Sequence, residues 1–214
     1  RRVALLRGIA PACALVAIGL LLYTGREVSV VRARPIWFSY GFPIVMFLSA
    51  LQALLALLLL AMRKRPGLQA PLARGMLLTL LLLGGAILLW VCGDTLSGAA
   101  VRHWLQTQAT ARQHAAGWIA LWALALACAA YRRLPRGGAP LLVAGALGLS
   151  WLMRWTLLIE VQTLPKYNAS YSPYSLPLGT DGLLAIVGTF GLWLALMIMV
   201  REAQAFLLRR KQHG

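Results

Sequence analysis

The sequence has few acidic residues and few charges of either sign. Only five of its 214 residues are Asp or Glu, and 12% are charged in total, whereas about a quarter of the residues in an average globular protein are charged. The chain is instead 60% hydrophobic, with a mean hydropathy of +0.74. This composition excludes an ordinary soluble domain and predicts a membrane protein.

The sequence also lacks the short motifs of several site types. Its cysteines, Cys13, Cys92 and Cys128, lie far apart in apolar segments without CxxC spacing, so we interpret them as small hydrophobic residues in helix packing. No phosphate-binding loop, metal-ligand cluster or nucleophile triad is present. His103 and His114 fall outside the apolar stretches, and we expect no haem, because a membrane b-type haem needs imidazole ligands within the bundle.

Basic residues are abundant, with 21 Lys and Arg and a formal net charge of +16. Basic proteins that bind nucleic acid carry such residues along a polar face or arm. Here they lie in the gaps between apolar runs. We therefore predict contact with membrane lipid and no nucleic-acid partner.

Six apolar stretches are long enough to cross a membrane. A hydrocarbon core of about 30 Å needs roughly 20 apolar residues in a helix. The stretches that qualify are 4–23, 38–62, 75–93, 115–131, 139–159 and 182–200. Turn and breaker residues separate them, and no linker is long enough to divide the chain into two soluble domains. We predict an all-α membrane protein, a single polytopic bundle of about six transmembrane helices over residues 1–214.

The loops differ in charge between the two sides of these spans. Most Lys and Arg residues fall on one side, which predicts that both ends of the chain are cytoplasmic. Four of the five acidic residues lie at or near the outer ends of spans: Glu27, Asp94, Glu160 and Asp181. The outer loops GREVSVVRARPIWFSYGFP and VQTLPKYNASYSPYSLP are rich in Trp, Tyr and Pro. This clustering indicates that the outer face is the functional one.

Arg154 is the one basic residue that the charge count leaves inside a span, since Arg7, near the start of the first span, is counted with the cytoplasmic side. A charge at a helix centre costs roughly 2.5–3.5 kcal/mol on insertion scales and usually faces a partner or a wet cavity. Trp151 lies three residues earlier, where a cation–π contact is possible. Glu160 lies about 240° further round an ideal helix, so the two charges are not expected to pair. The guanidinium therefore contacts another span, contacts a bound ligand, or reaches the outer interface by snorkelling. Both a structural role and a role in ligand or proton handling stay open.

Asp94 ends the third predicted span, in the stretch GDTLSG. Its carboxylate is suited to cap the short segment that follows, by accepting hydrogen bonds from exposed backbone N–H groups. It is equally suited to take up a proton at the outer surface. The sequence leaves both roles open.

Tyr23 lies where the first predicted span reaches the outer interface, with Arg26 and Glu27 just beyond it. A tyrosine at this depth is most often part of the aromatic belt. The alternative is a hydrogen-bond donor to a carbonyl or hydroxyl group of a lipid-soluble ligand.

The blocks YTGREVSVV, GDTLSG and RWTLLI, in this order, resemble the membrane subunits of the NrfD and polysulphide reductase C family, in particular those that serve reductases of tetrathionate. The likeness runs from the first residues to the last. Members of this family carry further helices before the region matched here. The resemblance therefore implies that this chain, which begins at Arg1 without a methionine, is the later portion of such a subunit.

The resemblance implies an anchor in the bacterial inner membrane that oxidises menaquinol or ubiquinol during anaerobic respiration. Electrons would pass to an iron-sulfur subunit and then to a molybdopterin catalytic subunit on the periplasmic side, where tetrathionate is reduced. The anchor itself would hold no haem or metal. Tyr23 matches a tyrosine for which a hydrogen bond to the quinone is implied, and Asp94 and Arg154 match polar positions inside the bundle.

We therefore expect a set of six quinol-binding or proton-handling residues. These are Tyr23, Arg26, Glu27, Asp94, Arg154 and Glu160. Tyr23 would hold a quinol oxygen, Asp94 or Glu27 would accept a proton, and Arg154 would set the local potential.

Two other functions fit parts of the sequence. A transporter also combines six spans with an intramembrane charge, but carriers commonly show paired repeats with broken helices near the midplane. No convincing repeat relates the first three spans to the last three. A purely structural anchor is the second alternative, and it would have no need of the charges at Asp94 and Arg154.

Overall fold

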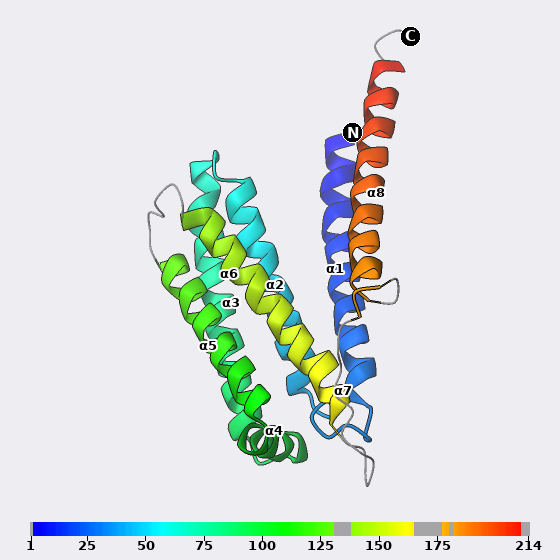
Figure 1. The fold of residues 1–214 in the computed structure, drawn as a ribbon. Coiled ribbons are helices and arrows are strands. Elements are labelled where there is room, and N and C mark those ends of the chain that lie inside the picture. Colours follow the sequence, from blue (N-terminus) through cyan, green and yellow to red (C-terminus); the bar gives the residue numbers. More distant parts are fainter. Residues whose placement is uncertain (1, 131–137, 165–176, 180–181, 211–214) are drawn as a thin grey trace. The chain divides into compact units, whose positions relative to one another are not determined.

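The computed structural model describes residues 2–130, 138–164, 177–179 and 182–210, and these ranges contain helices and loops but no strand (Figure 1). The helices are α1 (Arg2–Ser29), α2 (Gly41–Ala61), α3 (Pro66–Cys92), α4 (Leu96–Thr107), α5 (Ala109–Ala130), α6 (Gly138–Arg154), the π-helix η1 (Trp155–Glu160), α7 (Val161–Thr163) and α8 (Leu183–Arg210). The predicted all-α fold is confirmed, and so are six apolar helices of membrane-spanning length.

The chain divides into two compact units, Arg1–Ser172 and Pro173–Gly214. The second contains α8, which is long, apolar and exposed over most of its described side chains. The prediction that the whole chain forms one bundle stays a prediction.

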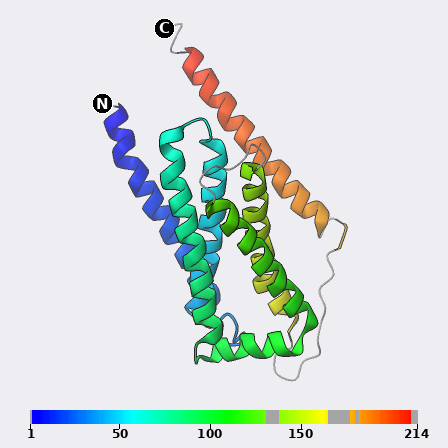
Figure 2. The same cartoon turned by 90° about the vertical axis from the view of Figure 1, so that its left-hand side faces the viewer.

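The first unit is built on α2, α3, α5 and α6. Helix α2 packs against α3 and α6, α5 packs against α6 and α3, and α1 packs against α2. The large side chains buried between these helices are apolar, and they include Phe42, Met76, Leu80, Leu149 and Met153. Figure 2 shows α4 lying across one end of the bundle, between the ends of α3 and α5. We call this end the α4 end; it is the side that the sequence predicts to be outer.

The first helix continues beyond its predicted end. The apolar stretch was expected to end at residue 23, but α1 reaches Ser29, and the span of membrane-crossing character is Ile9–Ser29. The Thr24 hydroxyl donates to the carbonyl oxygen of Leu20, at 3.1 Å, so this polar side chain has its hydrogen-bond partner within the helix. Tyr23, Arg26 and Glu27 are therefore helical residues inside a span, and Arg154 is not the only basic residue in one.

The GDTLSG stretch joins three parts of the bundle. Thr95, in an extended conformation, is the N-cap of α4, and its hydroxyl accepts from the Gly98 N–H at 3.0 Å. Thr95 therefore fills the capping role considered for Asp94, whose side chain is exposed. Ser97 accepts from the indole N–H of Trp90 at 2.8 Å and donates to the carbonyl oxygen of Ile36 at 2.7 Å. It thereby ties α3 and α4 to the loop between α1 and α2.

Three arginines near the α4 end donate to carbonyl oxygens at the ends of helices. Arg34 contacts residues 161, 162 and 164 after η1, Arg102 contacts residues 91 and 93 at the end of α3, and Arg112 contacts residues 105 and 106 at the end of α4. The last carbonyl groups of a helix have no partner within it, and a positive charge there also interacts favourably with the helix dipole. Partial burial lowers the pKa of Arg34, but an arginine stays charged at physiological pH.

Candidate functional site

A cleft with a polar end opens between α1, α2 and α3, and its volume is about 890 Å³. Five lining residues near the α4 end are polar: Arg26, Ser29, Ser39, Tyr40 and Thr95. The rest of the lining is almost wholly apolar: Phe38, Gly41, Ile44, Leu48, Leu81, Leu82, Gly85, Ala86, Leu89 and Trp90. The cleft thus suits a molecule with a polar head and a hydrocarbon body.

Arg26 is the charged group of this cleft. Its guanidinium lies over the ring of Tyr40, 4.6 Å from the ring centroid, and donates to the hydroxyl of the buried Ser29 at 3.1 Å. The Ser29 hydroxyl donates to the Arg26 carbonyl oxygen at 2.8 Å. These contacts fix the arginine beside the loop that leads into α2. A guanidinium has five N–H donors, so some remain for a ligand oxygen.

Glycines shape the wall that α2 and α3 present to the cleft. A Cβ atom on Gly41 would lie 2.6 Å from Cγ of Trp90, so only glycine lets the indole pack against the start of α2. A Cβ atom on Gly85 would meet nothing within 4 Å, because this residue faces the open cleft. Gly41 thus allows close packing of Trp90, and Gly85 leaves space in the cleft for a ligand.

Tyr23 and Glu27 form a pair on α1, one turn apart. The Tyr23 hydroxyl donates to the Glu27 carboxylate, and both side chains are exposed. Neither lines the cleft. On an ideal helix, Arg26 lies about 60° round from Tyr23. Glu27 lies about 100° round from Arg26, so the pair is on α1 but outside the face that lines the cleft.

Arg154 lies between α6 and α2 and is half-buried. Its guanidinium donates to the Ser49 hydroxyl at 3.0 Å, to the Met46 carbonyl oxygen at 3.3 Å, and to the hydroxyl and carbonyl oxygens of Ser150. All of these partners are neutral. Of the three alternatives that the sequence leaves open, the structure shows a partner on another span: α2 supplies a hydroxyl and a carbonyl group.

A fully buried glutamine continues this polar contact between α2 and α6. The Gln52 amide nitrogen donates to the Ala146 carbonyl oxygen at 2.8 Å and to the Ser49 carbonyl oxygen at 3.1 Å. Together with Arg154 it forms a polar seam in an otherwise apolar interface. Such contacts orient two helices where apolar packing alone has little directional preference.

The segment after Arg154 departs from α-helical geometry. Residues Trp155–Glu160 form a π-helix, so the angle of an ideal helix between Arg154 and Glu160 does not apply. The indole N–H of Trp37 donates to the carbonyl oxygen of Leu157 in this segment, at 2.6 Å. Trp151 stacks on Trp155, with ring centroids 5.7 Å apart, and makes no cation–π contact with Arg154 among the described residues.

The structure brings together only some of the expected site residues. Arg26 lines the cleft, whereas the other five residues expected at the site, Tyr23, Glu27, Asp94, Arg154 and Glu160, do not. Asp94 is next to Thr95, which does. Asp181 and residues 165–176 of the aromatic outer loop lie outside the described residues. No cluster of three or more His, Cys, Asp or Glu side chains is placed to hold a metal ion within the part of the chain that the structure describes.

Sequence reasoning missed four polar residues of the cleft, namely Ser29, Ser39, Tyr40 and Thr95. The aromatic, proline-containing loop of residues 25–43 contains three of them and indicates the outer face as the functional one. It does not indicate which of its residues line the cleft. Only the packing of α1 and α3 against α2 selects these four.

Comparisons with known proteins agree with this architecture. Residues 2–166 match the family model described as polysulphide reductase, NrfD. The chain is 56% identical over 209 residues to the C subunit of tetrathionate reductase from Salmonella typhimurium, an alignment that covers 96% of this chain and 62% of that protein. The chain thus spans about three-fifths of the length of this relative. No solved structure matches the present chain. With the six apolar helices, the family match indicates a multi-pass membrane protein.

Proposed function

Because the chain belongs to the polysulphide reductase NrfD family, we propose that it is the quinol-oxidising part of a tetrathionate reductase membrane subunit. The observation that carries the proposal is the cleft between α1, α2 and α3. Its arginine, serine, tyrosine and threonine side chains gather at one end, and its apolar wall follows the membrane-spanning helices. A quinol has the same division, with two hydroxyl groups on a ring and a hydrocarbon tail.

The chemistry that the cleft must support is the loss of two protons and two electrons from a quinol to give a quinone. Arg26 donates hydrogen bonds to a quinol oxygen and stabilises the negative charge that forms there when a proton leaves. The neighbouring Tyr23–Glu27 pair accepts that proton at the carboxylate and passes it towards the α4 end. Asp94, exposed at the same end, is a second acceptor.

The electrons leave this chain for the partner proteins of the proposed complex. They pass to an iron-sulfur subunit and then to a molybdopterin catalytic subunit, both on the periplasmic side. The chain then lies in the bacterial inner membrane, with its α4 end periplasmic and both of its ends cytoplasmic. The positive charge of the opposite loops supports this orientation.

Filling the cleft tests whether it is the quinol site. Gly85→Leu, placed in the full-length protein and its complex, is expected to raise the KM for quinol about tenfold, because overfilling a packed site costs about 1–3 kcal/mol. The fold should tolerate the change, since a Cβ atom at Gly85 meets nothing within 4 Å. Steady-state quinol oxidation measures the effect. The matched control is Gly19→Leu, at another helical glycine with open space; equal kinetics for both variants would contradict the proposal.

Substitutions at the polar end test the assigned roles. Arg26→Gln is expected to lower kcat/KM for quinol about ten- to hundredfold, the value of one or two hydrogen bonds from a charged donor. Tyr23→Phe should lower kcat more than it raises KM, because it disturbs the proton acceptor rather than the binding wall. Arg63→Gln, an exposed arginine at the opposite end of α2, is the control. If Tyr23→Phe and Asp94→Asn both left turnover unchanged, the proton route would be wrong.

A further inference from the structure

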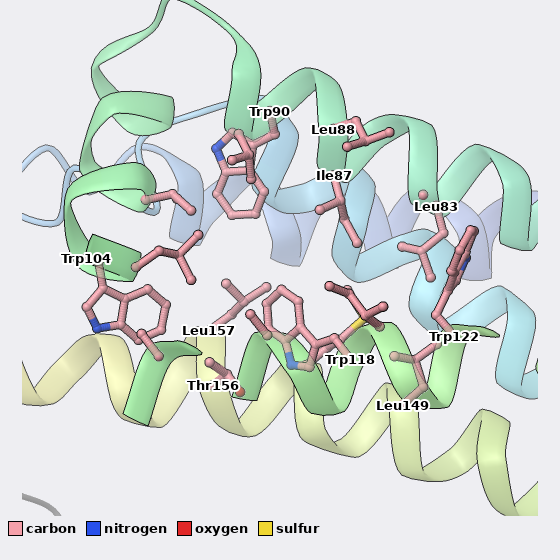
Figure 3. A pocket seen from close by; sticks show the side chains of 18 residues that line it. Leu83, Ile87, Leu88, Trp90, Trp104, Trp118, Trp122, Leu149, Thr156 and Leu157 are labelled. Carbon is pink, nitrogen blue, oxygen red and sulfur yellow. The ribbon is translucent and has the colours of Figure 1, made fainter. Parts of the chain in front are cut away.

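Trp90 belongs to the walls of two spaces at once. It lines the cleft, and it also lines a second space, of about 310 Å³, between α3, α4, α5 and α6. Figure 3 shows this second space, with the ring of Trp90 in its wall. The indole is buried and packs against the start of α2 at Gly41. A movement of this one ring therefore changes the shape of the cleft close to its polar end.

The hydroxyl group of Ser97 holds this ring in place. Ser97 lies in the first turn of α4 and is fully buried. Its Oγ atom accepts from the indole N–H of Trp90 at 2.8 Å and donates to the carbonyl oxygen of Ile36 at 2.7 Å. Ser97 does not line the cleft. It can therefore influence a ligand there only through its two partners.

The second partner of Ser97 leads to the charged group of the cleft. Ile36 belongs to the loop between α1 and α2, and residues 38–40 of this loop line the cleft. The guanidinium of Arg26 lies over the ring of Tyr40, 4.6 Å from its centroid. A shift of the loop at Ile36 therefore reaches the arginine that is proposed to bind a quinol oxygen.

We propose that Ser97 is a positioning residue for quinol oxidation, because its one hydroxyl group fixes both the Trp90 wall and the loop that carries Tyr40. The inference rests on the proposed function of the cleft. Without the hydroxyl group, a buried indole N–H and a buried carbonyl oxygen lose their partners, which is costly, so both groups move towards other partners. A displacement of about 1 Å at a reacting group can lower the rate about a hundredfold.

Two substitutions of Ser97 test this role in the full-length protein and its complex. With menadiol or decylubiquinol as the substrate, Ser97→Ala is expected to lower kcat/KM about ten- to hundredfold. Ser97→Cys nearly keeps the volume but offers only a weakly hydrogen-bonding thiol, so kcat/KM should fall as well. Thr79→Ala removes another buried hydroxyl, outside the cleft, and should leave the kinetics unchanged. Parent kinetics in both Ser97 variants overturn the positioning role.

A double variant tests whether Ser97 acts through Trp90. Trp90→Phe keeps an aromatic ring and removes the N–H group that Ser97 accepts. Because both substitutions break the same hydrogen bond, the loss of kcat/KM in the double variant with Ser97→Ala should be smaller than the product of the two single losses. Losses that multiply would show that the two residues act separately and would overturn the proposal.

A measurement without quinol separates this inference from the function of the cleft. In full-length protein labelled with 5-fluorotryptophan, the fluorine NMR resonance of Trp90 is assigned by its absence in Trp90→Phe. It should shift in Ser97→Ala and stay in place in Thr79→Ala, and a resonance that does not move in Ser97→Ala overturns the proposal. Parent kinetics in Ser97→Ala, while Gly85→Leu raises KM, overturn the positioning role alone. Parent kinetics in both variants overturn the proposed function, and the positioning role with it.

Discussion

Replacing Arg154 by alanine is expected to lower the free energy of unfolding of the full-length protein by about 1.5–3 kcal/mol, the usual value of hydrogen bonds to a charged group. The change removes the guanidinium that joins α6 to the Ser49 hydroxyl and the Met46 carbonyl oxygen of α2. It also leaves Ser49, which is fully buried, with one bond fewer. Unfolding in mixed detergent micelles, followed by circular dichroism, measures the loss.

Two further variants separate a structural role from a chemical one. Arg154→Lys should recover only part of the stability, because a lysine is a point donor and does not reproduce the planar fork of arginine. In the double variant with Ser49→Ala the combined loss should be smaller than the sum of the two single losses, since both remove the same bond. If Arg154→Ala kept full stability but abolished quinol oxidation, the role in ligand or proton handling would stand instead.

Gly98→Ala is expected to be the most disruptive small substitution in the GDTLSG stretch. Its Cβ atom would lie 2.6 Å from the carbonyl oxygens of both Gly93 and Trp90, and these are backbone atoms that cannot rotate away. We expect a loss of about 1–3 kcal/mol, the cost of overpacking. The N-cap at Thr95 should also shift, so quinol oxidation at the neighbouring cleft should fall with stability.

The control for Gly98→Ala is Gly19→Ala, in the middle of α1. There the added Cβ atom meets nothing within 4 Å, so the substitution should stabilise the helix by about 0.5–1 kcal/mol. Thermal unfolding of the two variants should therefore move in opposite directions. A Gly98→Ala protein as stable as the parent would mean that α4 does not approach the end of α3 this closely.

The all-α fold and the six membrane-spanning segments could be predicted because hydropathy is a local property, whereas α4 and the π-helix η1 were not predicted. Each span needs only enough consecutive apolar residues, and this requirement is met without knowledge of any neighbour. The ends of helices were harder. The charges of Arg26 and Glu27 interrupted the apolar run at residue 23, whereas α1 continues to Ser29. Proline at position 66 is suited to the first turn of a helix, and α3 begins there rather than at residue 75.

The site could be predicted only in part. Arg26 was among the residues expected, and it lines the cleft. The N-cap of α4 is Thr95 and not its neighbour Asp94. Either side chain can cap a helix, and which of them does so depends on the residue at which the helix begins. The partners of Arg154 on α2 lie more than one hundred positions earlier in the chain, and no local pattern identifies them.

The sequence by itself determined that this chain has six segments able to cross a membrane, and its distinctive blocks determined the family to which it belongs. Hydropathy adds up along a segment, and a family signature is a string of residues, so both can be read without coordinates. The tertiary structure decided which polar groups share a cleft and that Arg154 joins two helices through neutral oxygens. These are properties of pairs of atoms from distant segments, and only the packing of the helices brings those atoms within hydrogen-bonding distance.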